Sequence, residues 1–304
     1  MDGWTWQITA ASQAGTSHLR RGEECADALS VVVRDSTLIL SVADGAGSAK
    51  YGAVGSAAVA DISTKLAVAM LEKDTSAQDA LRRCTFVRDV FNHTLETLGV
   101  VAGHAERILS GTEAARPSDI SEALVSHAAA AVADGIRKLS GSDPAKGSRF
   151  ELRDLHTTLL LAVLTEHGLS AGNIGDGWLV VGLANGEIRI VAPPAPAEYA
   201  NETFFLDSAG ALDDAVYEHV AGEEVAALTL MTDGPARFAV DLSSQRPSAG
   251  LLQKFFALAA DRDIPREERD SQLAAFLASD RVCKCTDDDK TIVLAARVPA
   301  DGTE

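Results

Sequence analysis

The order of hydrophobic and polar positions along this chain predicts strands near its start, followed by helices. Loose alternation predicts a strand over residues 4–11, and apolar runs at 29–33 and 38–43 predict a hairpin. Apolar residues at helical spacing then predict a helix over residues 52–71. The chain therefore begins as a small antiparallel unit that leads into a helical region.

The helical region continues with two further predicted helices. Ser76 is a candidate N-cap for a helix over 76–98. Residues 99–117 have a mixed pattern and are predicted to form a loop or a broken helix. Another helix is predicted to begin at Ser118 or Asp119, and the glycines and proline within 141–147 are expected to end it.

The second half of the chain is dominated by short apolar runs separated by turn residues. They predict strands over 158–165, 169–174, 178–183, 187–191, 226–231 and 291–297, and helices over 251–260 and 266–278. Residues 193–222 show no clear period, and we expect an irregular segment that forms a flap over a site. Strands and helices that are segregated in this way favour an α+β fold with antiparallel sheets. Because no linker is visible, we expect one domain over residues 1–304.

Composition and charge narrow the class of protein. The chain is 46% hydrophobic but only 5% aromatic, so Ala, Val and Leu must fill most of the core. Its net charge of 27 − 44 = −17 argues against nucleic acid or an anionic membrane as the main partner. Four cysteines form no regular framework and the start lacks a signal-peptide pattern, which favours a cytoplasmic protein with reduced thiols. With no evident interface stripe, we expect a monomer.

Aspartates stand at the edges of several apolar runs. Asp44, Asp176 and Asp233 are each followed by glycine, and residues 287–289 are three successive aspartates. A single Asp-Gly pair is weak evidence, because it is common in turns. Four such positions at strand ends would repel one another if the fold brought them together, and hard divalent cations with oxygen ligands would relieve that repulsion. The pattern therefore predicts a metal centre built from carboxylates.

Six short motifs give the chain a resemblance to a known family. They are Gly15-Thr16-Ser17-His18 with Cys25-Ala26-Asp27-Ala28, Val42-Ala43-Asp44-Gly45-Ala46-Gly47, Thr157-Thr158-Leu159, Gly175-Asp176-Gly177, Thr232-Asp233-Gly234 and Asp288-Asp289-Lys290-Thr291. In this order, over residues 15–298, they resemble the metal-dependent protein phosphatases of type 2C. The nearest branch is the bacterial one with Ser-His and Asp-Gly-x-Gly-Ser motifs. The resemblance implies a sandwich of two antiparallel β-sheets flanked by α-helices, in four αββα layers.

The resemblance also implies a centre of two Mn²⁺ or Mg²⁺ ions, with a third ion at a weaker site. Carried over by position, its ligands are Asp44 as the bridge, the Gly45 carbonyl, Asp233, Asp288 and, for the third ion, Asp176. Asp288 is preferred to its neighbours because the family's ligand lies three residues before the Thr that opens the strand. Asp27 is expected to order water beside the ions. A hydroxide bridging the ions would attack the phosphorus of phosphoserine or phosphothreonine.

Two residues that many relatives have are missing here. Gly22 stands where an arginine grips the substrate phosphate, and Ala46 stands where a histidine is proposed to protonate the leaving group. The candidates for the missing positive charge are Arg20, Arg21 and Lys50. His18 is the candidate general acid, although a structural histidine is the commoner outcome.

The resemblance therefore predicts a metal-dependent serine/threonine protein phosphatase. Its partner would be a phosphorylated protein, and a cognate Ser/Thr kinase or its targets are the expected setting by analogy with bacterial relatives. The alternative is a regulator of the same fold that binds phosphoproteins without hydrolysing them, which the two missing residues favour and the retained aspartates disfavour. A third hypothesis is that the protein hydrolyses small phosphate esters.

Overall fold

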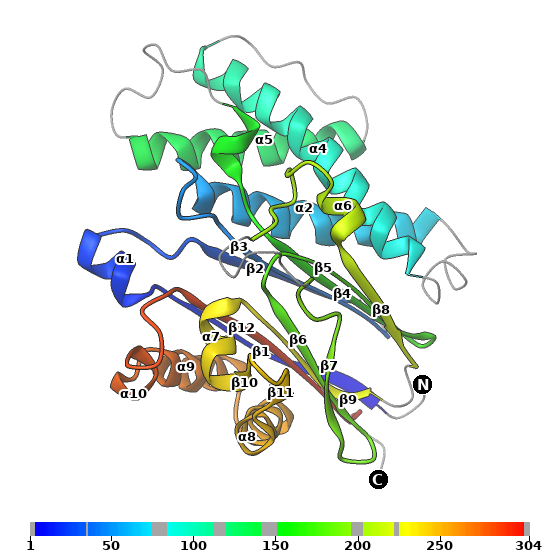
Figure 1. The fold of residues 1–304 in the computed structure, drawn as a ribbon. Helices are drawn as coiled ribbons and strands as arrows, with labels where there is room; N and C mark the ends of the chain where they lie inside the picture. Colours follow the sequence, from blue (N-terminus) through cyan, green and yellow to red (C-terminus); the bar gives the residue numbers. More distant parts are fainter. Residues whose placement is uncertain are drawn as a thin grey trace.

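Two antiparallel sheets, packed face to face and covered by helices, make up the part of the chain that the structure describes (Figure 1). The structure is a computed structural model, and it describes residues 4–34, 36–73, 84–111, 120–140, 151–195, 203–221 and 225–300. This arrangement confirms the predicted α+β sandwich of antiparallel sheets flanked by helices. That the whole chain forms one domain stays a prediction.

The first sheet combines the two ends of the chain with its middle. Its strands, in spatial order, are β1 (Trp4–Gln13), β12 (Lys290–Pro299), β9 (Val225–Met231), β6 (Trp178–Leu183) and β7 (Ile188–Val191). Because β12 pairs with β1 on one side and β9 on the other, it brings distant motifs to one edge of the sandwich. A short pair, β10 (Val240–Asp241) and β11 (Arg246–Pro247), lies apart from this sheet.

The second sheet is built mostly from neighbouring strands. Its strands, in spatial order, are β2 (Asp27–Arg34), β3 (Thr37–Asp44), β4 (Leu159–Thr165), β5 (Gly168–Ile174) and β8 (Val216–Val220). Strands β4 and β5 are buried along their whole length. A strand covered on both faces favours a continuous apolar run rather than alternation. Strand β4 carries such a run, whereas β5 also buries the polar residues Ser170 and Asn173.

Helices cover the outer face of each sheet (Figure 1). The second sheet is covered by α2 (Gly52–Lys73) and α4 (Thr85–Leu109), and α5 (Ile120–Ser140) packs on these two helices. The first sheet is covered by α8 (Ala249–Ala260) and α9 (Arg266–Leu277). The shorter elements are α1 (Thr16–Arg21), the 3₁₀ turn Leu152–Leu155, α6 (Ala211–Asp214), α7 (Asp233–Ala239) and α10 (Asp280–Cys283).

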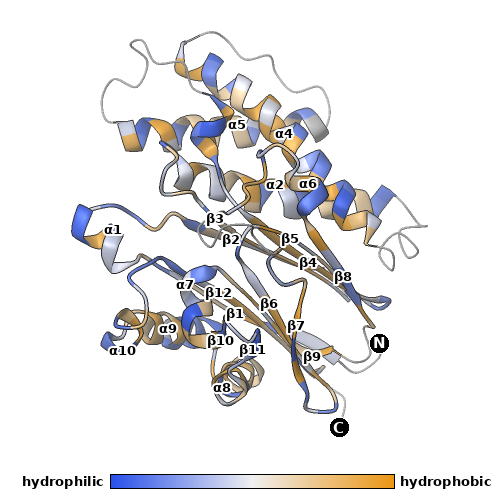
Figure 2. Ribbon diagram, in the orientation of Figure 1, coloured by the Kyte–Doolittle hydropathy of each residue, from blue (hydrophilic) through white to orange (hydrophobic). Residues whose placement is uncertain are grey.

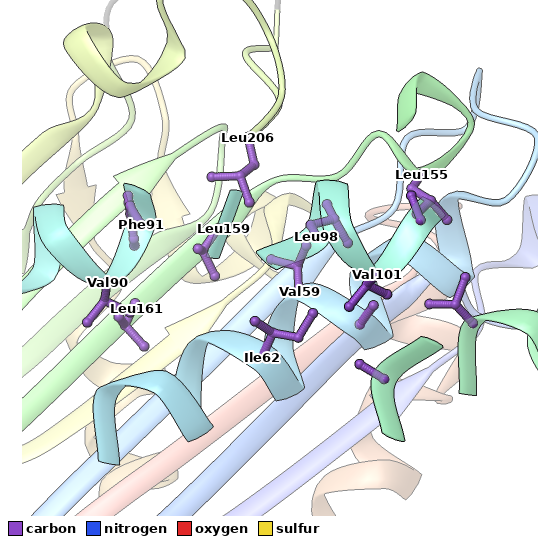
Figure 3. Close-up of a cluster of buried hydrophobic side chains, with 14 of the residues drawn as sticks. Val59, Ile62, Val90, Phe91, Leu98, Val101, Leu155, Leu159, Leu161 and Leu206 are labelled. Carbon is purple, nitrogen blue, oxygen red and sulfur yellow. The ribbon is translucent and has the colours of Figure 1, made fainter. Parts of the chain in front are cut away.

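The hydrophobic core has three layers. Leu40, Leu160, Leu228 and Val293 belong to the cluster between the two sheets. A second cluster lies between the second sheet and its helices, as the close-up in Figure 3 shows, and a third lies under α8 and α9. Hydrophilic residues gather instead at turns such as the one between β6 and β7 (Figure 2). The apolar residues thus lie between the layers, whereas hydrophilic residues lie at the loop ends of the sandwich.

Helix α2 is long and apolar enough to cross a membrane, judged by length and composition alone, but 56% of its most apolar stretch is buried inside the protein. Val59 and Ile62 belong to the cluster that contains Leu98 and Val101 of α4 (Figure 3). Packing against both a sheet and a second helix requires apolar side chains on more than one face, which accounts for the composition of α2.

Two predictions about segments were wrong. Residues 99–117 were predicted to form a loop or a broken helix, but residues 99–109 continue α4 without a break, with Val101 and Ala105 buried at helical spacing. Residues 112–117 lie outside the described part of the chain. A Cβ at Gly99 or Gly103 would meet nothing, so these glycines sit on an open face and do not break the helix. The predicted irregular flap contains β8, an edge strand of half-buried residues that pairs with β5.

Other predictions fall on positions that are not described. The starts proposed at Ser76 and at Ser118 or Asp119, and the break at 141–147, lie outside the described residues. The remaining predicted strands and helices are present, with bounds that differ by a few residues.

Candidate metal centre

The β2–β3 hairpin places two carboxylates at one end of the second sheet. Asp27 opens β2 and Asp44 closes β3, and the two residues are direct partners in the antiparallel register. The backbone of Asp44 is fixed by the threonine pair predicted as a motif: its N–H donates to Thr158 Oγ1 at 2.9 Å, and its carbonyl accepts from Thr157 Oγ1 at 2.7 Å. Strand register and these hydrogen bonds together fix the position of the Asp44 backbone and so the direction of its side chain.

The turn after Asp44 depends on glycine. A Cβ on Gly45 would collide with the backbone of Gly52, the first residue of α2. Only glycine permits this approach, so the loop passes directly beside the start of α2. The Gly45 N–H donates to the Ala26 carbonyl at 3.2 Å, which ties the turn to the loop that carries Asp27.

Asp233 and Asp288 come from the ends of neighbouring strands in the first sheet. Asp233 begins α7 directly after β9, and Asp288 lies in the loop before β12. Since β9 and β12 pair from Met231 with Ile292 onward, both aspartates emerge at the same edge. Asp233 and Asp288, together with Asp27, Asp44 and Asp176, line one pocket of about 1490 Å³ at the end of the sandwich.

Asp289 has a different role from its neighbour Asp288. Its carboxylate accepts hydrogen bonds from the backbone N–H groups of Gly15 and Ala26, and it is 3% exposed. His18 Nδ1 lies 2.8 Å from Asp289 Oδ2. Asp289 therefore fastens the N-terminal loops to the last motif, while Asp288 faces the pocket. Asp289 was not a predicted ligand, and its structural role was not predicted from the sequence.

His18, the predicted general acid, lines the pocket but has a carboxylate on each side. Besides its contact with Asp289, its Nε2 lies 3.8 Å from Glu23 Oε2. A histidine whose ring is oriented by a buried carboxylate is well suited to holding two loops together. The structure gives His18 this structural contact, and its catalytic role stays a prediction.

The pocket carboxylates raise one another's pKa. Burial raises the pKa of Asp44 well above its usual value, and the charges of Asp27, Asp176, Asp233 and Asp288 add to the rise. Burial likewise raises the pKa of Asp27 to about 8, opposed by the hydrogen bond that Thr232 Oγ1 donates at 2.7 Å. Burial also raises the pKa of Asp233 to about 6. Bringing a positive charge into the pocket would reverse these shifts.

The donors present fit a divalent cation. Asp176 Oδ2 accepts from Thr203 Oγ1 at 3.1 Å, whereas Oδ1 is buried and has no hydrogen-bond partner. A buried carboxylate oxygen left without a partner is costly, and positive charge in the pocket would offset that cost. The carboxylate oxygens of Asp44, Asp233 and Asp288, which line the same pocket, are the type of ligand that Mg²⁺ and Mn²⁺ prefer. Within the described residues, no three His, Cys, Asp or Glu side chains are already drawn together around one point. The pocket therefore holds the donors that a divalent cation needs.

The comparisons with known proteins decide the family. Residues 14–278 match the family model described as Protein phosphatase 2C. The chain belongs to the protein phosphatase 2C family. It is 27% identical over 299 residues to Serine/threonine-protein phosphatase 3 of Escherichia coli (strain K12), which covers 96% of this chain and 98% of that protein.

Solved structures agree with the fold. Crystal structures of the serine/threonine phosphatase Stp1 from Staphylococcus aureus and of a bacterial serine phosphatase variant are similar, with TM-scores of 0.54 and 0.51. Both are 15% identical; the first match covers 97% of each chain, and the second covers 96% of this chain and 98% of the other. Membership of the family confirms the predicted function, a metal-dependent phosphoprotein phosphatase, and does not favour the regulator that only binds.

One further charged residue, Arg237, contacts a pocket aspartate and was not predicted from the sequence. Arg237 lies four residues after Asp233 on α7, and its Nη2 is 3.3 Å from Asp233 Oδ2. An i,i+4 ion pair of this kind can be read from sequence only where a helix is predicted, and no helix was predicted over 233–239.

Proposed function

We propose that this phosphatase hydrolyses phosphoserine and phosphothreonine in proteins, at the pocket formed by Asp44, Asp233 and Asp288. Two Mn²⁺ or Mg²⁺ ions would be held by Asp44 with the Gly45 carbonyl and by Asp233 with Asp288. When bound, such ions lower the pKa of water towards neutrality and offset the charge of the phosphoryl group. The observation that carries the proposal is the single pocket in which buried carboxylates raise one another's pKa.

The chain's own residues would orient the reaction. The hydroxyl of Thr232 holds the Asp27 carboxylate beside Asp44, where it would order a water molecule next to the ions. Thr157 and Thr158 hold the backbone of Asp44 and so keep its carboxylate aimed at the reaction centre. Such fixed groups contribute because they need no rearrangement when the reaction occurs.

Lys50 is our candidate for meeting the substrate phosphate in place of the missing arginine. It lines the pocket, and its Nζ lies 4.9 Å from the centre of the Tyr51 ring. Arg21 also lines the pocket, but its Nε is 2.6 Å from Glu23 Oε2, which already neutralises it. Arg20 is not among the residues that line the pocket. A lysine binds phosphate as a mobile point charge, which suits a site that accepts different phosphoproteins.

The setting of the enzyme is also proposed from its composition and its family. We expect a cytoplasmic monomer that acts on proteins phosphorylated by a Ser/Thr kinase. The four cysteines are free within the structure, in keeping with a reducing compartment.

The test is release of phosphate from a phosphothreonine peptide, with and without Mn²⁺, beside the Asp233→Asn variant. We expect release that depends on Mn²⁺ and falls strongly in the variant. Tight peptide binding without release in saturating Mn²⁺ would instead support the binding regulator. Faster hydrolysis of a nucleotide than of the peptide would support the hydrolase of small esters.

A further inference from the structure

Among the aspartates that line the pocket, Asp233 has a positively charged side chain beside it, that of Arg237. Asp176 lies in the turn between β5 and β6, and Asp233 begins α7. One helical turn later, Arg237 places Nη2 3.3 Å from Asp233 Oδ2. Arg237 does not line the pocket, so its guanidinium approaches Asp233 from outside. Its side chain is 50% exposed, whereas that of Asp233 is 20% exposed.

The charge of Arg237 acts first on Asp233. Arg237 contacts Asp233 directly, and Asp176 lines the same pocket as Asp233. The Asp27 carboxylate instead accepts a hydrogen bond from a neutral group, the Thr232 hydroxyl. A guanidinium stays charged at every relevant pH, so Arg237 carries its positive charge whenever it contacts Asp233.

Each carboxylate nevertheless keeps one oxygen for other partners. Asp233 Oδ2 faces Arg237 and leaves Oδ1, while Asp176 Oδ2 accepts from Thr203 and leaves the unpartnered Oδ1. A metal ion that is bound by Asp288 can therefore still be coordinated by Oδ1 of Asp233. An additional dication between Asp176 and Asp233 would have to bind beside a positive guanidinium, and like charges at that range repel.

We propose that Arg237 acts as the resident cation of the Asp176–Asp233 pair and takes the place of a third metal ion. The centre then binds two ions and has no independent third site, which departs from the third ion implied by the family resemblance. This inference rests on the proposed two-ion function, and it makes Arg237 a residue that sets metal stoichiometry rather than one that touches substrate.

The experiment counts Mn²⁺ bound to the purified protein by equilibrium dialysis with elemental analysis, from micromolar to millimolar Mn²⁺. Wild type, Arg237→Gln and Arg237→Lys are compared, since Gln removes the charge and Lys keeps it. We expect two ions per chain in the wild type and in Arg237→Lys. In Arg237→Gln we expect a third equivalent, with an affinity at that site raised by about ten-fold or more.

A second variant separates a local effect from misfolding. Adding Asp176→Asn to Arg237→Gln should abolish the gained equivalent and leave two ions bound. Three ions in the wild type, or identical binding in wild type and Arg237→Gln, would overturn the inference and leave the two-ion function standing. No Mn²⁺ bound by the wild type would contradict the proposed function itself. Thermal melting of each variant verifies that it is folded.

Discussion

The pocket has two sides, one with Asp27 and Asp44 and the other with Asp176 and Asp233. Each side brings two carboxylates into the pocket, but the structural means differ. Asp27 and Asp44 are opposed by strand register in one hairpin, and the groups that hold them are threonine hydroxyls. Asp176 and Asp233 come from a turn and a helix start, and Arg237 partly neutralises them. The first side therefore depends on cations from solution, whereas the second brings part of its own charge. Substitution of Asp44 or Asp27 should therefore cost more activity than substitution of Asp176, whereas Asp233 is itself a proposed ligand of the two-ion centre.

The largest effect is expected from Asp44→Asn. Asp44 is the proposed bridging ligand on the side without a cation, so phosphopeptide hydrolysis should fall by more than about a hundred-fold, beyond the 10–100-fold typical of residues that only support a metal ligand. Asp176→Asn, measured in the same Mn²⁺ titration, should cost about ten-fold or less. Equal losses in the two variants would remove the distinction between the sides.

Asp27→Asn should rank next. Its carboxylate is held by Thr232 and lies beside Asp44 rather than replacing it, so we expect a loss of about 10–100-fold in kcat. Thr232→Val, which removes only the hydroxyl that positions Asp27, is the matched control and should cost less. If the control cost as much as Asp27→Asn, the hydroxyl rather than the carboxylate would be the important group.

The same carboxylates predict how stability depends on pH when metal is chelated. Asp27 has its pKa raised from 3.8 to about 8 and Asp233 from 3.8 to about 6, so the folded state holds more protons than the unfolded state between these values. Stability should therefore fall as pH rises from about 4 to 8 and then level off. In EDTA we expect the melting temperature to drop by several degrees, on the order of 2–4 °C per kcal/mol.

Two additions sharpen this measurement. Asp27→Asn should flatten the upper part of the profile, because it removes the carboxylate with the pKa near 8. Mn²⁺ added at pH 8 should restore the melting temperature. A profile that rises with pH in EDTA would mean that these carboxylates are stabilised as anions by something other than metal.

The smallest effect is expected from Thr203→Val. Thr203 Oγ1 donates one neutral hydrogen bond, of 3.1 Å, to Asp176, and such a bond contributes about 1 kcal/mol, so activity should change by about five-fold at most. Thr158→Val removes the acceptor of the Asp44 N–H and should cost more. The comparison is made in kcat/KM on one phosphopeptide at saturating Mn²⁺.

The elements and motifs that were predicted correctly are those with a clear local sequence pattern. The apolar run of β4 and the Asp-Gly motifs are short-range features, and the chosen Asp288 does face the pocket. It failed at β8 because an edge strand carries polar residues such as Glu218 and lacks a buried alternation. It failed at the end of α4 because Gly99 resembles a breaker and sits on an open face.

The partners of the site residues were harder to predict for a physical reason. Asp289 binds Gly15 and Ala26 across the whole length of the chain, which depends on β12 pairing with β1. Arg237 becomes a neighbour of Asp233 only because α7 starts at that aspartate. Neither contact follows from composition or spacing unless the strand order of the first sheet is already known.

The most direct test of the account is the anomalous diffraction of a crystal soaked in Mn²⁺. We expect two manganese peaks at the end of the sandwich, both bonded to Asp44, with Asp233 and Asp288 on one of them and Arg237 still beside Asp233. No peak in this pocket, or peaks that do not contact Asp44, would contradict the claim that these strand ends form one two-ion centre.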